Sequence, residues 1–334
     1  MLLDVWSLAL IVCSTVVAFL MVFAGRSALR VLRFWNPASD DNRQIRLENE
    51  IWLTSTLVEY GLGVQIISLV VFVLAADHFA GSIPGAMCAT GALLADPRGM
   101  PTLLIKLAGV FLYGFWLLLH QLDIRSEHYP LVRVKYIYLL LLLPFLALDI
   151  GLQMSYLAGL RPDIITSCCA VVFDSSSGGG PLLLRAPQVP VLQLFYATVL
   201  LLAGLAVFLL RRRRITAAIA YSLGWCWFFG LAMVAIITVF SSYIYNMPFH
   251  KCPFCILKPQ YHFIGFLLYG TLIPATFFGI TPVLVEPFRH RPGLAGPIAI
   301  YRTAALKISL FLLLVFTALA SFPYLRYMLT GGES

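Results

Sequence analysis

Eight apolar runs constrain the fold of this 334-residue chain more than any other feature. Each run is long enough to cross about 30 Å of hydrocarbon as a helix. The runs lie near residues 5–24, 57–76, 102–120, 136–158, 191–210, 216–243, 262–284 and 304–325. Charged residues make up 11% of the chain, whereas about 25% is usual in a soluble domain. We therefore expect an all-α fold, a polytopic helix bundle with about eight transmembrane helices in a lipid bilayer.

The segments between the runs alternate in basic content, which predicts their orientation. Segments after the first, third, fifth and seventh runs hold clusters such as Arg211 to Arg214, and the intervening segments hold few basic residues. Because Lys and Arg are retained on the cytoplasmic side, we expect both termini on the periplasmic side of a bacterial inner membrane. The net charge of +8 fits inner loops that meet anionic lipid. It gives no reason to expect nucleic acid as a partner.

Cysteines gather in the segments expected outside. Five of the seven cysteines are placed there, namely Cys88, Cys168, Cys169, Cys252 and Cys255. Cys13 and Cys226 fall within apolar runs, where cysteine usually packs as a small apolar residue. Thiols outside the cytoplasm meet oxidants, quinones and soft metals. The outer segments are therefore the expected place of function.

The sequence Cys252-Pro253-Phe254-Cys255 precedes the seventh run, and we expect it to open that helix. At the positive end of a helix the pKa of the first thiol falls, and the second thiol lies within disulfide reach. This pattern is typical of a redox-active pair, although a structural disulfide has the same spacing. No histidine follows Cys255, so covalent haem c attachment is excluded at this motif.

Residues 136–284 hold a helix, a loop with cysteines, a further helix and then the Cys-x-x-Cys before another helix. This order resembles the vitamin K epoxide reductase and DsbB group of membrane thiol oxidoreductases. Residues 167–176 are similar to that group's loop of cysteine, Val-Phe and Ser-Ser. The resemblance implies thiol-disulfide exchange on the periplasmic face, with quinone as a candidate electron acceptor.

The resemblance also assigns roles to the outer cysteines. It implies that Cys252 and Cys255 form the redox centre and that Cys168 or Cys169 relays electrons from a periplasmic thiol protein. Cys88 is expected as a further relay thiol. The chain would then divide into residues 1–135 with three helices and the first cysteine-bearing loop, a thiol-redox core at 136–284, and a last helix with its tail at 285–334.

A soft-metal site is the second hypothesis for the third outer segment. Sulfur and imidazole groups are concentrated there, on Met247, His250, Cys252, Cys255 and His262. Such ligands suit copper, mercury or zinc. The two histidines also fit a plain position at the membrane surface. A third hypothesis is a non-catalytic integral subunit of a larger membrane or respiratory complex, in which the cysteines act as disulfide clamps between subunits.

Two charged residues fall within apolar runs at similar expected depth. Lys106 lies near the outer end of the third run, and Asp149 lies in the outer half of the fourth. Charges inside the membrane are costly and usually functional. We expect the two side chains to pair, either as a structural ion pair or as part of a proton relay.

Overall fold

The computed structural model describes residues 2–35, 42–126, 129–161, 163, 166, 187–247 and 250–330. These residues are predominantly helical, and no strand occurs among them. Eight of the described helices are long and apolar enough to cross a membrane. Hydrocarbon offers no hydrogen bonds to the backbone, so continuous helices are the form in which such runs can cross it. The expected all-α, multi-pass architecture is confirmed, whereas the side on which the termini lie stays a prediction.

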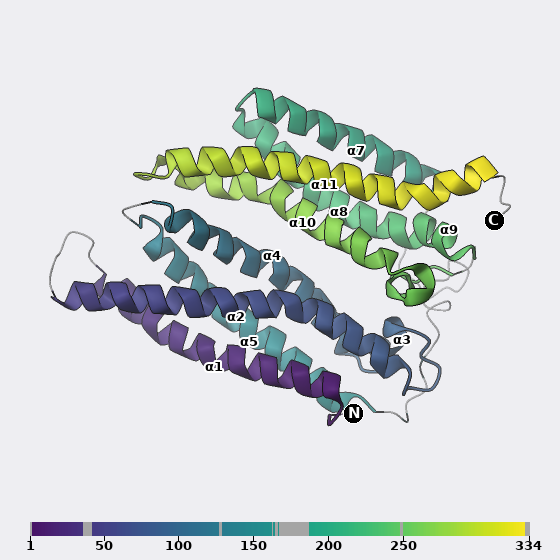
Figure 1. Ribbon diagram of the computed structural model, residues 1–334, viewed down its shortest axis with the longest axis horizontal. Helices are drawn as coiled ribbons and strands as arrows, with labels where there is room; N and C mark the ends of the chain where they lie inside the picture. The colour runs from purple at the N-terminus through teal and green to yellow at the C-terminus, as the bar shows by residue number, and fades with distance from the viewer. Residues whose placement is uncertain are drawn as a thin grey trace. The chain divides into compact units, whose positions relative to one another are not determined.

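The chain forms two compact units, and the first comprises the described parts of 1–85, 91–166 and 288–297. Its long helices are α1 (Val5–Phe34), α2 (Asn42–Ala80), α4 (Gly99–Asp123) and α5 (Val132–Gly159), with the short α3 (Ala89–Leu94) before α4. The helices α1 and α4 each pack against both α2 and α5 (Figure 1). Buried aromatic side chains such as Tyr113, Trp116 and Tyr136 fill the space between them. Unit 1 is therefore a four-helix bundle.

Helix α1 and helix α2 extend beyond their apolar runs. The polar stretch 25–52, which the ends of the first two apolar runs predict as one inner loop with a turn at 36–41, is helical up to Phe34 and again from Asn42. Residues 36–41 lie outside the described residues. Glu50 of α2 accepts a hydrogen bond from Ser27 at 2.6 Å and pairs with Arg30 at 2.9 Å. The loop expectation was wrong because hydropathy locates the hydrocarbon boundary, while a helix can continue into water when such contacts stabilise it.

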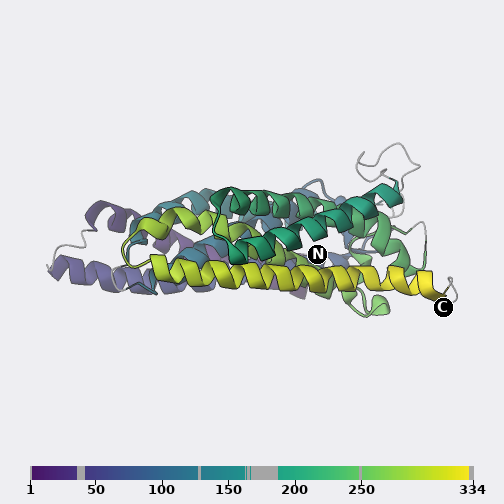
Figure 2. The same ribbon diagram turned by 90° about the horizontal axis from the view of Figure 1, so that it is seen from above.

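Unit 2 comprises Ala86–Thr90 with the described parts of 167–287 and 298–334. Its helices are α7 (Gln188–Arg211), α8 (Ile215–Ala235), the π-helical η2 (Ile236–Phe240), α9 (Ser241–Tyr245), the 3-10 turns η3 (Cys255–Leu257) and η4 (Pro259–Tyr261), α10 (Ile264–Val285) and α11 (Ala295–Thr330) from Ile298 onward. The short η5 (Glu286–His290) is divided between the two units. Figure 2 shows α11 as one long continuous helix. The segments α8, η2 and α9 together form one span, Ile215–Tyr245.

The described interior of unit 2 is mainly aromatic, and Arg302 is its one buried charged residue. Phe195 lies 5.5 Å from Phe228 and 6.2 Å from Phe316 between ring centroids, so α7, α8 and α11 share one cluster. A hydrogen bond between side-chain hydroxyls joins α8 to α11, since the hydroxyl oxygens of Tyr221 and Ser309 are 2.8 Å apart. Such pairs satisfy buried polar groups without burying a charge.

Candidate functional site, a buried group of three thiols

Three cysteines of unit 2 bring their sulfur atoms together. The Sγ atoms of Cys88, Cys252 and Cys255 all lie within 4.8 Å of one another, and all three residues are buried. Cys88 and Cys252 are 164 positions apart in sequence, yet their sulfurs are 3.4 Å apart. A disulfide bond is about 2.05 Å long, so these two sulfurs are not bonded to each other. We call this set the three-thiol group.

Tyrosines of the flanking helices hold the chain around Cys252. The hydroxyl of Tyr245, at the end of α9, donates to the carbonyl of Cys252. Tyr269 of α10 donates to the carbonyl of Pro253 at 2.7 Å. The two helices on either side of the Cys-x-x-Cys therefore fix its backbone. These two hydrogen bonds orient the sulfurs that project from that backbone.

A glycine allows the turn after Cys255 to pack closely on α10. A Cβ atom at Gly265 would lie 2.8 Å from side-chain atoms of both Ile256 and Leu257, and 3.0 Å from the backbone carbon of Ile256. Any larger residue in the first turn of α10 would push η3 away. The position of Cys255 in the three-thiol group therefore depends on Gly265.

The segment that carries Cys88 is tied to the same region. Lys258 Nζ donates to the carbonyl of Met87 at 2.8 Å. On the other side of Cys88, Thr90 Oγ1 lies 3.4 Å from the sulfur of Cys252. These contacts on both sides of Cys88 hold its sulfur beside those of the Cys-x-x-Cys.

The Cys-x-x-Cys does not open a long helix, contrary to the sequence expectation. Cys255 begins only the three-residue η3, and α10 begins at Ile264. Lys258 has ψ 154°, the extended conformation favoured before a proline, and Pro259 follows it. His262 and Phe263 then adopt φ 54° before α10 starts. The helix-end effect invoked to lower the pKa of the Cys252 thiol is therefore absent.

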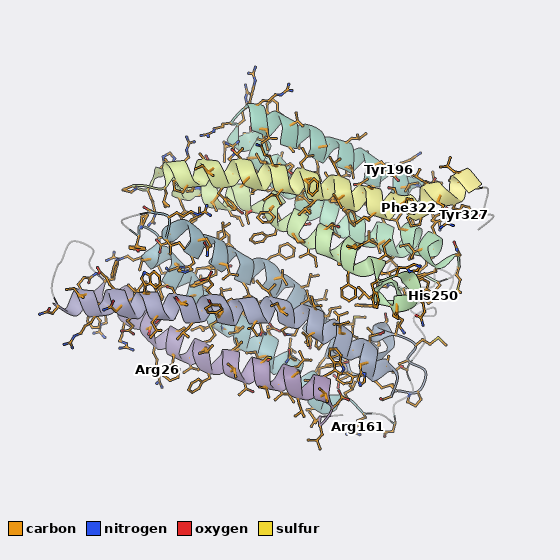
Figure 3. The ribbon with its side chains drawn as sticks, viewed as in Figure 1. Arg26, Arg161, Tyr196, His250, Phe322 and Tyr327 are labelled. Carbon is orange, nitrogen blue, oxygen red and sulfur yellow. The ribbon has the colours of Figure 1, made fainter. Side chains whose placement is uncertain are left out.

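His250 adds an imidazole beside the three-thiol group. Its ring centroid is 4.6 Å from that of Tyr245, and its Nε2 atom is buried with no hydrogen-bond partner in the described part of the chain. Figure 3 labels His250 at the end of unit 2 at which α11 finishes. Burial lowers the pKa of His250, and the negative charge of the Cys88 thiolate partly opposes that shift. A neutral imidazole can act as a metal ligand.

Other residues expected at the site stand apart from it. Met247 is 54% exposed, and His262 is also exposed and does not belong to the three-thiol group. Cys168 and Cys169, the expected relay thiols, lie outside the described residues. The sequence indicated Cys88 only as a relay thiol and not as a neighbour of both Cys252 and Cys255. Its place after α2, like that of Cys252 after the span ending at Tyr245, was the available signal that the two could meet.

The described part of unit 1 holds two buried lysine–aspartate ion pairs, of which the sequence indicated one. Lys106 Nζ lies 3.1 Å from Asp149 Oδ1, so the two side chains are in contact. The second pair joins Lys135 to Asp123 at 3.0 Å. Lys135 falls between the third and fourth apolar runs, in a segment that the sequence predicts as an inner loop. The signal for the second pair was the opposite charge of two residues that flank the short connection between α4 and α5.

Comparisons of this chain with protein-family models, with curated proteins and with solved structures found no match. The resemblance to membrane thiol oxidoreductases over residues 136–284 therefore stays a prediction. The fold defines a multi-pass helical membrane protein with a buried three-thiol group in unit 2.

Proposed function

We propose that this protein binds one soft metal ion, copper(I), mercury(II) or zinc, through Cys88, Cys252 and Cys255. The observation that carries the proposal is the convergence of three buried sulfurs within 4.8 Å of one another. A zinc–thiolate bond is about 2.3 Å long, so sulfurs on one tetrahedral ion lie about 3.8 Å apart. The spacing of the three-thiol group is compatible with a single ion at its centre.

His250 is the candidate for a fourth ligand. Its buried Nε2 lacks a hydrogen-bond partner among the described residues. A buried polar atom without a partner is costly, and a metal ion would satisfy it. Three thiolates with one imidazole form a common zinc set, whereas three thiolates alone suit three-coordinate copper(I) or mercury(II). The metal that the purified protein prefers therefore reports whether His250 takes part.

Burial favours metal binding over thiol-disulfide exchange at this group. Exchange requires a partner to align with an accessible sulfur. Cys88 and Cys252 are both 0% exposed and Cys255 is 6% exposed. A small ion needs far less space to enter than a protein partner does. The low basic content of the segments that carry these residues supports a location on the periplasmic face of the inner membrane.

Thiol oxidation is the second candidate, and the 3.4 Å separation of the Cys88 and Cys252 sulfurs favours it. Joining these two thiols would release two protons and two electrons, which a quinone can accept to become a quinol. The pair would differ from Cys252 and Cys255, the pair expected from the sequence. A periplasmic thiol protein would return the electrons. Cysteine mapping distinguishes this disulfide from a metal-bound group.

The test is metal content of the purified protein with matched cysteine variants. The protein is prepared in detergent with a reductant, loaded with copper(I), mercury(II) or zinc in separate samples, and measured by native mass spectrometry and elemental analysis. We expect one ion per chain, and its loss in Cys88→Ser, Cys252→Ser and Cys255→Ser. Cys226→Ser is the control, because Cys226 lies exposed on α8 of the same unit.

Three outcomes are informative. Retention of the ion in all three variants would place the metal elsewhere in the chain. Failure of all three metals to bind the reduced protein would reject the metal proposal. A Cys88–Cys252 disulfide that forms with added quinone, in protein that binds no metal, would establish the second candidate instead.

A further inference from the structure

Three methionines of the described chain have largely exposed side chains, and two of them adjoin residues of the three-thiol region. Met87 is 66% exposed and directly precedes Cys88. Met247 is 54% exposed and lies three residues before His250. The third, Met328, is 56% exposed near the end of α11 and adjoins none of these residues in sequence. Exposed thioethers are therefore present on both segments that carry the buried ligands.

The backbone at both methionines is fixed by hydrogen bonds. The carbonyl of Met87 accepts a hydrogen bond from Lys258 Nζ at 2.8 Å. The N–H of Met247 donates to the carbonyl of Ser242 at 3.2 Å, which ties it to α9. The carbonyl of Met247 in turn accepts from the N–H of His250 at 3.3 Å. Each thioether is therefore carried by a defined backbone position, while its side chain is exposed.

The potential ligands become more buried from Met247 through His250 to Cys88. His250 has intermediate exposure with a buried Nε2 atom, and it lies within electrostatic range of Cys88. Cys88 itself is 0% exposed. The ligand also changes in charge along this series, from a neutral thioether through an imidazole to a thiol that binds metal as the thiolate. Because a charged ligand in a buried place attracts a cation more strongly than a neutral one at the surface, the series favours inward movement of an ion.

Thioether sulfur distinguishes among the three candidate metals. It is a soft, neutral ligand that suits copper(I), whereas zinc sites in proteins are built from thiolate, imidazole and carboxylate groups. Mercury(II) is divalent and gains more from the charged thiolates than from a neutral sulfur. Exposed methionines beside the three-thiol group therefore favour copper(I) over the other two ions.

We propose that Met87 and Met247 are the outer ligands through which copper(I) reaches the three-thiol group, and that copper(I) is the ion this protein takes up. The inference rests on the metal-binding proposal and names its metal. Copper(I) binds first to exposed thioether sulfur and then exchanges onto the buried sulfurs. The copper is neither oxidised nor reduced, the thioethers lose no proton, and each cysteine that binds copper releases its thiol proton to water.

The test measures the rate of copper(I) loading in methionine-to-leucine variants. Leucine keeps an apolar side chain of similar volume and removes the sulfur. Reduced protein in detergent is mixed with the copper(I) complex of bicinchoninic acid, and loss of the coloured complex is followed by stopped-flow absorbance. In the double variant Met87→Leu with Met247→Leu, we expect loading to slow by about tenfold, the lower end for an outer-shell partner. One copper ion per chain should still bind, because the three-thiol group is intact.

A matched variant and two other metals serve as controls. Met328→Leu removes an equally exposed thioether from α11 of the same unit and should load copper(I) at the wild-type rate. Zinc and mercury(II), each presented as the complex of a chromogenic chelator, should load at unchanged rates in every methionine variant. A general disturbance of the fold would slow all three metals.

The outcomes separate this inference from the metal-binding proposal. Wild-type loading of copper(I) in the double variant, equal slowing in Met328→Leu, or equal slowing of zinc or mercury(II) would each overturn the inference and leave the metal site in place. A wild-type protein that binds zinc or mercury(II) but no copper(I) would do the same. If the reduced wild-type protein binds none of the three ions, the metal-binding proposal fails as well, and that result needs no methionine variant.

Discussion

Units 1 and 2 each contribute four membrane-spanning helices, but they treat buried polarity in opposite ways. Among its described residues, unit 1 buries two lysines, three aspartates, three glutamines and one histidine, namely Lys106, Lys135, Asp96, Asp123, Asp149, Gln44, Gln65, Gln153 and His120. The buried polar side chains described in unit 2 carry hydroxyl groups, apart from Arg302 near the start of α11. The chemistry of unit 2 is concentrated beyond its helix ends, at the three-thiol group.

This difference indicates which property of each unit depends on its polar residues. Charges buried among helices lower the free energy of unfolding unless their partners are well placed. Unit 1 therefore keeps its ionisable groups at a cost in stability. Unit 2 has a mainly aromatic interior that holds its helices together, while the segment outside them carries the thiols. We therefore expect single substitutions at these groups to lower the metal affinity of unit 2 and the free energy of unfolding of unit 1.

The largest effect is expected for a thiol of unit 2. Cys252→Ser should weaken binding of the preferred metal by more than about 100-fold, because loss of a ligand costs more than the 10–100-fold typical of an outer-shell change. The measurement is competition against a chelator of known affinity. Cys13→Ser, a change at an exposed cysteine of α1 in unit 1, should leave the affinity unchanged. Equal loss in both variants would mean that the assay does not report the three-thiol group.

The next effect concerns the ion pair of unit 1. Asp149→Asn should lower the free energy of unfolding by about 3–5 kcal/mol, because Lys106 keeps its burial cost without its counter-charge. The double variant with Lys106→Met should recover part of that loss. Unfolding in detergent, measured for both single variants and the double variant, gives the coupling energy. Additive losses would show that the contact contributes little to stability.

The spans could be predicted from the sequence because hydrocarbon imposes a simple requirement, a long apolar helix. Lys106 and Asp149 could be paired because their positions in adjacent runs give similar depths. The turn around Cys255 could not be placed, because hydropathy does not register the effect of Pro259 or the positive φ angles before α10. The segment before α10 contains apolar residues, so its hydropathy pattern also fits the first turns of a helix.

The meeting of Cys88 with Cys252 was also beyond the sequence. A separation of 164 residues leaves many possible partners for a cysteine in an outer loop. The contact depends on hydrogen bonds such as that from Lys258 to the Met87 carbonyl, which no spacing rule encodes. Polar segments outside the bilayer lack the geometric constraint that makes spans predictable.

A smaller effect is expected from the tyrosine that supports Cys252. Tyr245→Phe removes the hydroxyl that donates to the Cys252 carbonyl and should lower metal affinity by about tenfold, the lower end for an outer-shell partner. Tyr243→Phe is the matched control on the same helix, because Tyr243 contacts the rings of Tyr324 and Tyr327. The measurement is the same chelator competition. Equal affinities in the two variants would show that the Tyr245 hydroxyl does not orient the site.

The smallest effect is a pH dependence carried by His250 in unit 2. Burial is the main cause that lowers the pKa of His250, so the folded state binds a proton less tightly than the unfolded chain, whose value is about 6.5. The contribution of this group to stability is therefore fully present above that value and declines as the pH falls through it. We expect the metal-free protein to melt at a lower temperature under mildly acidic conditions, and His250→Gln to reduce that dependence. Melting curves of both proteins at matched pH values give the measurement. Parallel curves for the two proteins would show that protonation of His250 does not affect the stability of unit 2.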